Sequence, residues 1–177
     1  KLLEGTANGS LKVDWKAGVT VSSEFTAEKI KVDQLTDVFT RDISLAGRLE
    51  GQFTLQSSGP SVGEVLDRPA IQGNFLVKEG AVGNIDLVQA MRSPGSVGGQ
   101  SKFADLSGQL RVADGVIHYE KLKFAGGVLF ANGSVSVNYA SSALSGNVSS
   151  EIRSSVAQDR ANFNVSGKVS RPVLKRG

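Results

Sequence analysis

The most regular feature of the chain is an alternation of apolar and polar residues with a period of two. In residues 11–15, Leu11, Val13 and Trp15 alternate with Lys12 and Asp14, and the same pattern runs through residues 45–55 and 129–137. Successive side chains of a β-strand point to opposite faces, so this period predicts strands with one apolar and one polar face. Such strands are typical of an antiparallel sheet that buries a single face.

Glycine-containing triplets between the apolar runs predict tight connections. Lys78-Glu79-Gly80 and Ala113-Asp114-Gly115 each place a glycine where a hairpin turn needs a positive φ. Consecutive strands are therefore expected to pair as a meander.

Three short helices are expected between the strands, at residues 33–39, 61–68 and 85–92. The second opens with Ser61 and Glu64 in the spacing of a capping box and stops before Pro69. The third carries Val88 and Met91 on one side, as a short amphipathic helix does. Residues 93–101 follow as a Gly/Ser-rich segment, which predicts a flexible loop.

An internal repeat supports the picture of similar hairpins added side by side. Residues 71–82 align without gaps with residues 106–117, and residues 49–55 match the first half again. Each of the two longer copies is predicted to be a strand followed by a glycine turn, which extends a sheet by repetition. Duplication within an ordinary β-sandwich is the alternative.

These patterns predict a mainly β fold. We expect a long, twisted antiparallel meander sheet of roughly nine to eleven strands. It would have one apolar face, be curved or half-closed, and carry two or three short helices. Residues 1–177 would form a single β-rich domain. Because the chain begins Lys-Leu-Leu without an initiator methionine, we interpret it as a fragment of a larger protein.

The apolar face of such a sheet needs a cover, which is either the protein's own chain or an apolar ligand. From the alternation alone, the members of this face are either lipid-facing or core, and the pattern does not distinguish the two. The predicted members are Phe53, Phe75, Leu110, Leu129, Val135, Val148, Phe163 and Val165.

Composition removes several kinds of chemistry. The chain has no cysteine, which excludes disulfides, thiolate metal sites and cysteine nucleophiles. His118 is its single histidine, so a multi-histidine metal site is excluded as well. No P-loop, EF-hand or dinucleotide fingerprint is present. We therefore expect neither a metal nor a cofactor.

Charge gives no indication of a nucleic-acid partner. The formal net charge is +3, from 20 basic and 17 acidic residues. Nucleic-acid binders concentrate a basic excess on one face, whereas the only small basic cluster here lies at the C-terminus. We interpret residues 173–177 as a solvated basic tail.

One motif fits an enzyme. Residues 59–63 read Gly-Pro-Ser-Val-Gly, the G-x-S-x-G pattern of the hydrolase nucleophile elbow. However, the predicted sheet is antiparallel and His118 is the only candidate base, while Ser61 already suits the role of a helix N-cap. We therefore expect that the chain is not an enzyme.

Three stretches together resemble the C-terminal region of the AsmA-like family. They are residues 55–87, residues 103–137 with the core Leu-x-Gly-x-Leu-x-Val-x-Asp-Gly-Val, and the closing Phe163-x-Val-x-Gly-x-Val-Ser-x-Pro172. The resemblance covers about residues 25–172. It implies a periplasmic portion of a protein that is anchored to the bacterial inner membrane by a helix outside this fragment, and it implies no catalytic motif.

The resemblance also implies a function in outer-membrane biogenesis. Members of the family look like relatives of bridge-type lipid carriers, in which an apolar groove of curved β-sheet holds phospholipid chains. The expected partners are thus phospholipid acyl chains and the neighbouring domains of the parent protein. The alternative is a structural or interaction module with a closed core, whose sheet edges dock those neighbouring domains.

Overall fold

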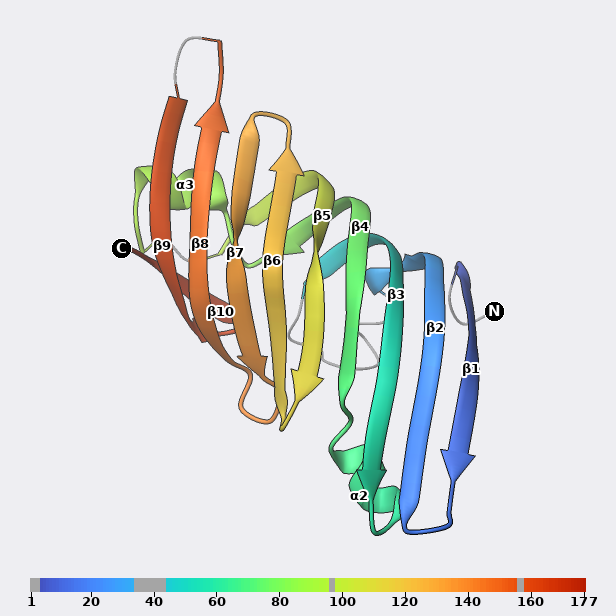
Figure 1. The fold of residues 1–177 in the computed structure, drawn as a ribbon. Coiled ribbons are helices and arrows are strands. Elements are labelled where there is room, and N and C mark those ends of the chain that lie inside the picture. The colour runs from blue at the N-terminus through green and yellow to red at the C-terminus, as the bar shows by residue number, and fades with distance from the viewer. Residues whose placement is uncertain (1–3, 34–43, 96–97, 156–157) are drawn as a thin grey trace.

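The computed structural model describes residues 4–33, 44–95, 98–155 and 158–177, which form one open antiparallel sheet of ten strands. Strands that are neighbours in the sequence are neighbours in the sheet, from β1 at one edge to β10 at the other (Figure 1). The predicted mainly β meander is therefore confirmed. The strands are β1 (Thr6–Asp14), β2 (Val19–Lys31), β3 (Leu45–Gly59), β4 (Ile71–Gly83), β5 (Gln100–Ala113), β6 (Val116–Gly126), β7 (Leu129–Asn138), β8 (Ala143–Arg153), β9 (Gln158–Lys168) and β10 (Arg171–Arg176).

The strand register gathers the apolar positions on one face of the sheet. Directly opposed residues of antiparallel strands point to the same face, and Gln52, Asn74 and Gln109 form such a row on the polar face. The neighbouring residue on each of these strands points to the opposite face, which is the apolar one. Its members from β2 to β9 are Phe25, Phe53, Gly73, Leu110, Tyr119, Val135, Gly146 and Val165.

Two of the three expected helices are present, and both begin at a side-chain cap. Helix α2 (Val62–Asp67) follows Ser61, whose hydroxyl accepts a hydrogen bond from the Glu64 N–H at 3.4 Å. Helix α3 (Leu87–Arg92) follows Asp86, whose Oδ1 accepts from the Gln89 N–H at 2.9 Å. The third expected helix, at residues 33–39, lies almost wholly outside the described residues.

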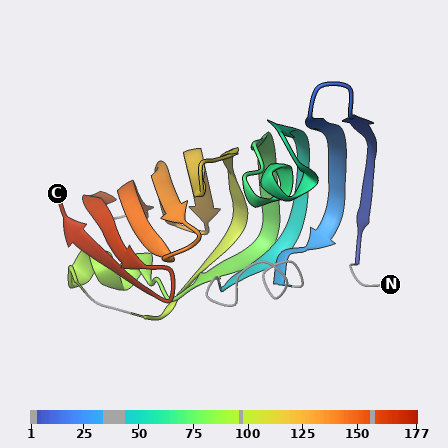
Figure 2. The same cartoon turned by 90° about the horizontal axis from the view of Figure 1, so that it is seen from below.

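Helix α3 and strand β10 cover the apolar face at its C-terminal end. Figure 2 shows α3 on one side of the sheet, at the end that carries β8 and β9. Leu87, Ala90 and Met91 of α3 are buried in the main core with Phe163 and Leu174. A hydrogen bond of 3.0 Å from the Gly95 N–H to the Leu174 carbonyl joins the end of the α3 segment to β10.

Lys78-Glu79-Gly80 is not the turn that its composition predicts. Strand β4 continues through it and keeps one register with β5 on both sides. On the β3 side the register shifts between the pairs Arg48–Lys78 and Ala46–Ala81, so that Glu79 and Gly80 lie opposite the single residue Gly47, and Glu79 has a φ of 51°. These are the properties of a β-bulge, in which one extra residue is inserted into a strand.

Ala113-Asp114-Gly115, by contrast, does form the predicted hairpin, between β5 and β6. Asp114 and Gly115 have φ values of 50° and 78°, and a type I′ turn requires both to be positive. The two copies of the sequence repeat are therefore different structures. Residues 71–82 lie within one strand, whereas residues 106–117 bend through a turn.

Two segments expected to be irregular are partly strand. Most of the supposed basic tail belongs to β10, where Leu174 is buried against the core while Lys175 and Arg176 stay exposed. At the end of the supposed loop 93–101, β5 already begins at Gln100. The buried Ser101 hydroxyl there donates to the Ile85 carbonyl and accepts from the Leu87 N–H.

Candidate functional site: an apolar cavity on the sheet

A hollow of about 240 Å³, here called the apolar cavity, lies on the apolar face of the sheet. Its sheet side consists almost entirely of carbon-rich side chains from β4 to β8. Further apolar residues come from outside these strands: from β3, from the segment that leads into α3, from the β9–β10 turn and from β10. The residues that form most of the wall are Phe75, Leu106, Tyr119, Leu122, Val135, Leu144, Val148, Ile85, Leu87, Val169 and Pro172.

Part of the wall of the apolar cavity is less buried than the core beside it. Phe75, Leu122, Val135 and Val148 are half-buried, whereas Phe163 in the adjacent core is only 1% exposed. A side chain in a closed core has protein atoms on all sides. The half-buried wall residues instead face a space that the described chain does not fill.

Tyr119 brings a polar group to this wall. Its ring meets Phe75 edge-on, with centroids 6.2 Å apart and an interplanar angle of 87°. Burial raises the pKa of the Tyr119 hydroxyl above its ordinary value, because the charged phenolate is poorly solvated there. The group is therefore a neutral phenol that can donate one hydrogen bond.

The eight residues predicted for the apolar face all lie on that face, and they differ in whether they also line the apolar cavity. Phe75, Val135 and Val148 line the apolar cavity. The others are in or against the core: Leu129 and Phe163 in the main cluster, Phe53 in a smaller cluster with Ala27 and Ile30, Leu110 packed against that smaller cluster, and Val165 buried on β9.

Some wall residues were not predicted for reasons that the structure makes clear. A register shift between Tyr119 and Leu122 breaks the strict alternation of β6, so that both side chains reach the same wall. Ile85 and Pro172 come from segments that reach the cavity only because α3 and β10 fold over the sheet. The period of two within one strand contains no signal for such long-range placement.

A larger hollow, of about 850 Å³, lies along the polar rows of β1 to β6. Gln52, Asn74 and Gln109 line it together with Arg111 and Glu120, whose charged groups are 3.7 Å apart. The surface is that of a solvated sheet face. Among the residues that the structure describes, no three His, Cys, Asp or Glu side chains gather in a way that would hold a metal ion.

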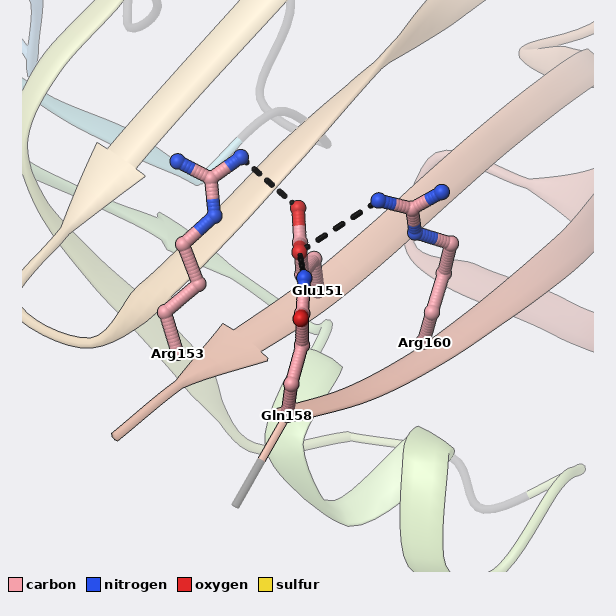
Figure 3. Close-up of polar contacts among 4 residues, drawn as sticks. All are labelled: Glu151, Arg153, Gln158 and Arg160. Atoms are coloured by element: carbon pink, nitrogen blue, oxygen red, sulfur yellow. Dashed lines mark hydrogen bonds and ion pairs between the residues drawn. The ribbon is translucent and has the colours of Figure 1, made fainter. Parts of the chain in front are cut away.

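The strongest charge cluster on the polar face joins β8 and β9 (Figure 3). Glu151 accepts from Arg153 at 2.8 Å and from the Gln158 side-chain amide, and Arg160 lies 3.3 Å away. These hydrogen bonds, with the one from Arg153 foremost, lower the pKa of Glu151 to about 2. The Arg153 guanidinium also lies 4.7 Å from the centre of the Phe130 ring. The cluster therefore links three strands and has no features of a catalytic carboxylate pair.

The structure places the two residues of the hydrolase hypothesis in separate contacts. The Ser61 hydroxyl caps α2 by accepting from Glu64, and His118 Nδ1 lies 2.9 Å from the Ser136 hydroxyl across β6 and β7. Within the described chain, no hydrogen bond joins Ser61 to His118, so the geometry of a nucleophile and its base is not formed there.

Comparison with known proteins gives this chain no relatives: no family model, no curated protein and no solved structure matches it. In the ranges that the structure describes, no helix is long and apolar enough to cross a membrane.

Proposed function

We propose that this chain is a non-enzymatic, periplasmic segment of an AsmA-like protein anchored to the bacterial inner membrane. In this proposal the apolar face of its sheet shields lipid acyl chains, and the segment contributes to phospholipid transport and outer-membrane biogenesis. The observation that carries the proposal is the apolar cavity, whose wall is almost entirely hydrocarbon and includes half-buried side chains from β4, β6, β7 and β8.

The three stretches that resemble the AsmA-like family all contribute to this cavity. Phe75 and Leu87 come from residues 55–87, Leu106 and Val135 from residues 103–137, and Pro172 from the closing motif. These stretches are far apart in the sequence and meet at one place in the fold. The resemblance and the geometry therefore support the same surface.

The size of the cavity suits part of an acyl chain. Pockets that enclose a drug-sized ligand are usually about 300–1,000 Å³, and the apolar cavity is smaller, at about 240 Å³. Each methylene that leaves water contributes about 0.8 kcal/mol. Burial of a few methylenes is thus enough to bind an acyl chain weakly and reversibly. The headgroup stays in water, so the chain should select only weakly among lipid headgroups.

The proposal is tested by the binding of a fluorescent fatty acid to the purified chain. Val135→Phe fills part of the cavity, since Val135 is half-buried and lines it. If two methylenes of the probe no longer fit in the cavity, the binding free energy falls by about 1.6 kcal/mol. The affinity for the probe is then more than tenfold lower.

Val116→Phe is the matched control. Val116 is also a half-buried valine of the same sheet, but it lies on the polar face, one residue from Ile117 of the apolar face. This variant should bind the probe like the unmodified chain. The proposal would be contradicted if the unmodified chain showed no saturable binding of the probe. It would also be contradicted if Val135→Phe and Val116→Phe lost that binding equally.

The second candidate is a structural module with a closed core whose edges dock neighbouring domains. The fully covered core under α3 and the exposed outer strand β1 favour it. A structural module should be folded and stable but should bind no apolar probe. The same binding experiment therefore distinguishes the two candidate functions.

A further inference from the structure

Tyr119 carries a polar group on the wall of the apolar cavity that the described chain does not use. Its ring packs edge-on against Phe75, but its hydroxyl forms no hydrogen bond with the residues that the structure describes. Ser101, another polar residue of the wall, differs because its hydroxyl donates to Ile85 and accepts from Leu87. A buried phenol usually has a hydrogen-bond partner. The Tyr119 hydroxyl is therefore a donor that a ligand can use.

The hydroxyl oxygen of Tyr119 is also accessible. In the described chain, Ser150 Oγ is the only polar side-chain atom that is fully enclosed and has no hydrogen-bond partner. The Tyr119 oxygen lacks a partner without being enclosed, and Tyr119 lines the apolar cavity. A ligand in the cavity can therefore accept a hydrogen bond from Tyr119, whereas the enclosed hydroxyl of Ser150 is out of reach.

Tyr119 lies at the margin of the cavity. On the apolar face its cross-strand neighbours are Leu110 of β5 and Val135 of β7. Val135 lines the cavity, whereas Leu110 packs against the smaller cluster that contains Phe53. An acyl chain has its one polar group, the carbonyl, at the end that joins the headgroup. A carbonyl next to Tyr119 thus leaves the methylenes against the hydrocarbon wall and the headgroup outside it.

The wall offers no charge to balance a charged ligand group. None of the described residues that line the cavity is a lysine, arginine, histidine, aspartate or glutamate. Moving an ionised carboxylate or phosphate into such surroundings costs far more than moving a neutral carbonyl, for which one hydrogen bond compensates much of the loss of water. The cavity therefore suits an uncharged acceptor.

We propose that Tyr119 donates a hydrogen bond to the ester carbonyl oxygen of a bound lipid. This assignment rests on the proposed function, because it names the group of the lipid that the apolar cavity binds beside the methylenes. It leaves the selection among headgroups weak, since the ester carbonyl is common to phospholipids. A fatty-acid anion binds by its methylenes alone, with its carboxylate in water.

The proposal is tested by measuring how well three ligands displace the fluorescent fatty acid from the unmodified chain and from Tyr119→Phe. The ligands are methyl octanoate, the octanoate anion and undecane, an alkane of the same length as the ester. Tyr119→Phe should lower the affinity for methyl octanoate about fivefold, which corresponds to one ordinary hydrogen bond. It should leave the affinities for undecane and octanoate unchanged, because neither ligand places an acceptor beside residue 119.

Tyr139→Phe is the matched control. Tyr139 is the only other tyrosine of the chain, and its hydroxyl donates to the Asp67 carbonyl at 3.5 Å. It is not among the residues that line the cavity, so this variant should bind all three ligands like the unmodified chain. Infrared spectroscopy of bound methyl octanoate measures the hydrogen bond directly. The C=O stretch should lie at a lower frequency in the unmodified chain and in Tyr139→Phe than in Tyr119→Phe.

The stability of Tyr119→Phe without ligand is a second measurement. The variant keeps the ring and its contact with Phe75, so it should fold normally. Its free energy of unfolding should equal or exceed that of the unmodified chain, because only a hydroxyl without a partner is removed. A clear loss of stability would mean that the hydroxyl already has a partner within the protein, and would overturn the proposal.

The binding results distinguish a failure of this assignment from a failure of the proposed function. If methyl octanoate and undecane bind but Tyr119→Phe weakens neither of them, or both equally, the cavity holds acyl chains and Tyr119 does not bind the carbonyl. If Tyr119→Phe weakens octanoate as much as the ester, the hydroxyl binds a carboxylate and the assignment to an ester is wrong. If no ligand binds the unmodified chain, both proposals fail.

Discussion

At the scale of single residues, glycines in the sheet matter because aromatic rings occupy the space next to them. A Cβ on Gly73 would overlap the Gln52 carbonyl oxygen and the ring of Phe53. We therefore expect Gly73→Ala to destabilise the chain by about 1–3 kcal/mol, as overpacking does. Gly63 in α2 is the matched control, because the nearest atom to its Cβ would be the Ser61 hydroxyl oxygen at 3.9 Å.

For Gly63→Ala we expect a gain of up to about 1 kcal/mol, since alanine restricts the unfolded chain and favours helix. Urea denaturation of both variants measures the difference. Equal effects of the two substitutions would mean that the space around Gly73 is not as tight as the structure has it.

The Glu151 cluster gives the fold a dependence on acid. In the folded chain the pKa of Glu151 is lowered from 4.5 to about 2, first of all by its hydrogen bond with Arg153. A group with a lowered folded pKa stabilises the fold at pH values above its unfolded pKa, and this stabilisation is lost on protonation. It is thus complete above about pH 4.5 and disappears as the pH falls towards 2.

Glu151→Gln should therefore lower the melting temperature at pH 7, and the difference from the unmodified chain should shrink as the pH falls below 4.5. Thermal unfolding across this range measures it. Glu79→Gln, which removes the exposed partner of Arg48, controls for the loss of one negative charge. If the difference in melting temperature between Glu151→Gln and the unmodified chain stayed constant with pH, the Glu151 cluster would not stabilise the fold as proposed.

At the scale of elements, the caps of the two helices should contribute unequally to stability. Asp86 accepts from Gln89 at 2.9 Å and begins α3, which buries Leu87, Ala90 and Met91 in the main core. We expect Asp86→Ala to cost about 1 kcal/mol.

Ser61→Ala should cost about 0.5 kcal/mol, the low end of the range for caps. Its hydrogen bond with Glu64 is longer, at 3.4 Å, and α2 lies at the end of β2 and β3 away from the main core. Chemical denaturation of the two variants tests this order. A larger loss for Ser61→Ala would mean that α2 contributes more to the fold than its contacts indicate.

Elements with a local cause were predictable from the sequence, whereas those with a long-range cause were not. The alternation is sufficient to predict the strands, and Ser61 with Glu64 is sufficient to locate α2. Glu79-Gly80 and Asp114-Gly115 look alike in sequence, yet one is a bulge within β4 and the other a hairpin turn. The difference lies in the direction of the chain after the glycine. Residues 81–83 continue along β4 between β3 and β5, whereas Val116 turns back to pair with Ala113 of β5.

At the scale of the whole molecule, the same limit applies to the apolar cavity. Phe163 and Val148 are equivalent in their strand patterns and oppose each other across β8 and β9. In the fold, Phe163 is buried in the core under α3, whereas Val148 packs against the same core, stays half-buried and lines the cavity. Local alternation places both side chains on the apolar face, but the path of α3 and β10 decides which part of that face is closed.

Native mass spectrometry of the chain with phospholipid, followed by lipid extraction, measures whether the apolar face holds acyl chains. We expect the unmodified chain and Val116→Phe to retain phospholipid in a defined stoichiometry, and Val135→Phe to lose it, with both variants folded. A lipid-free chain that takes up no added phospholipid would contradict it, and the apolar face would then belong to a structural module.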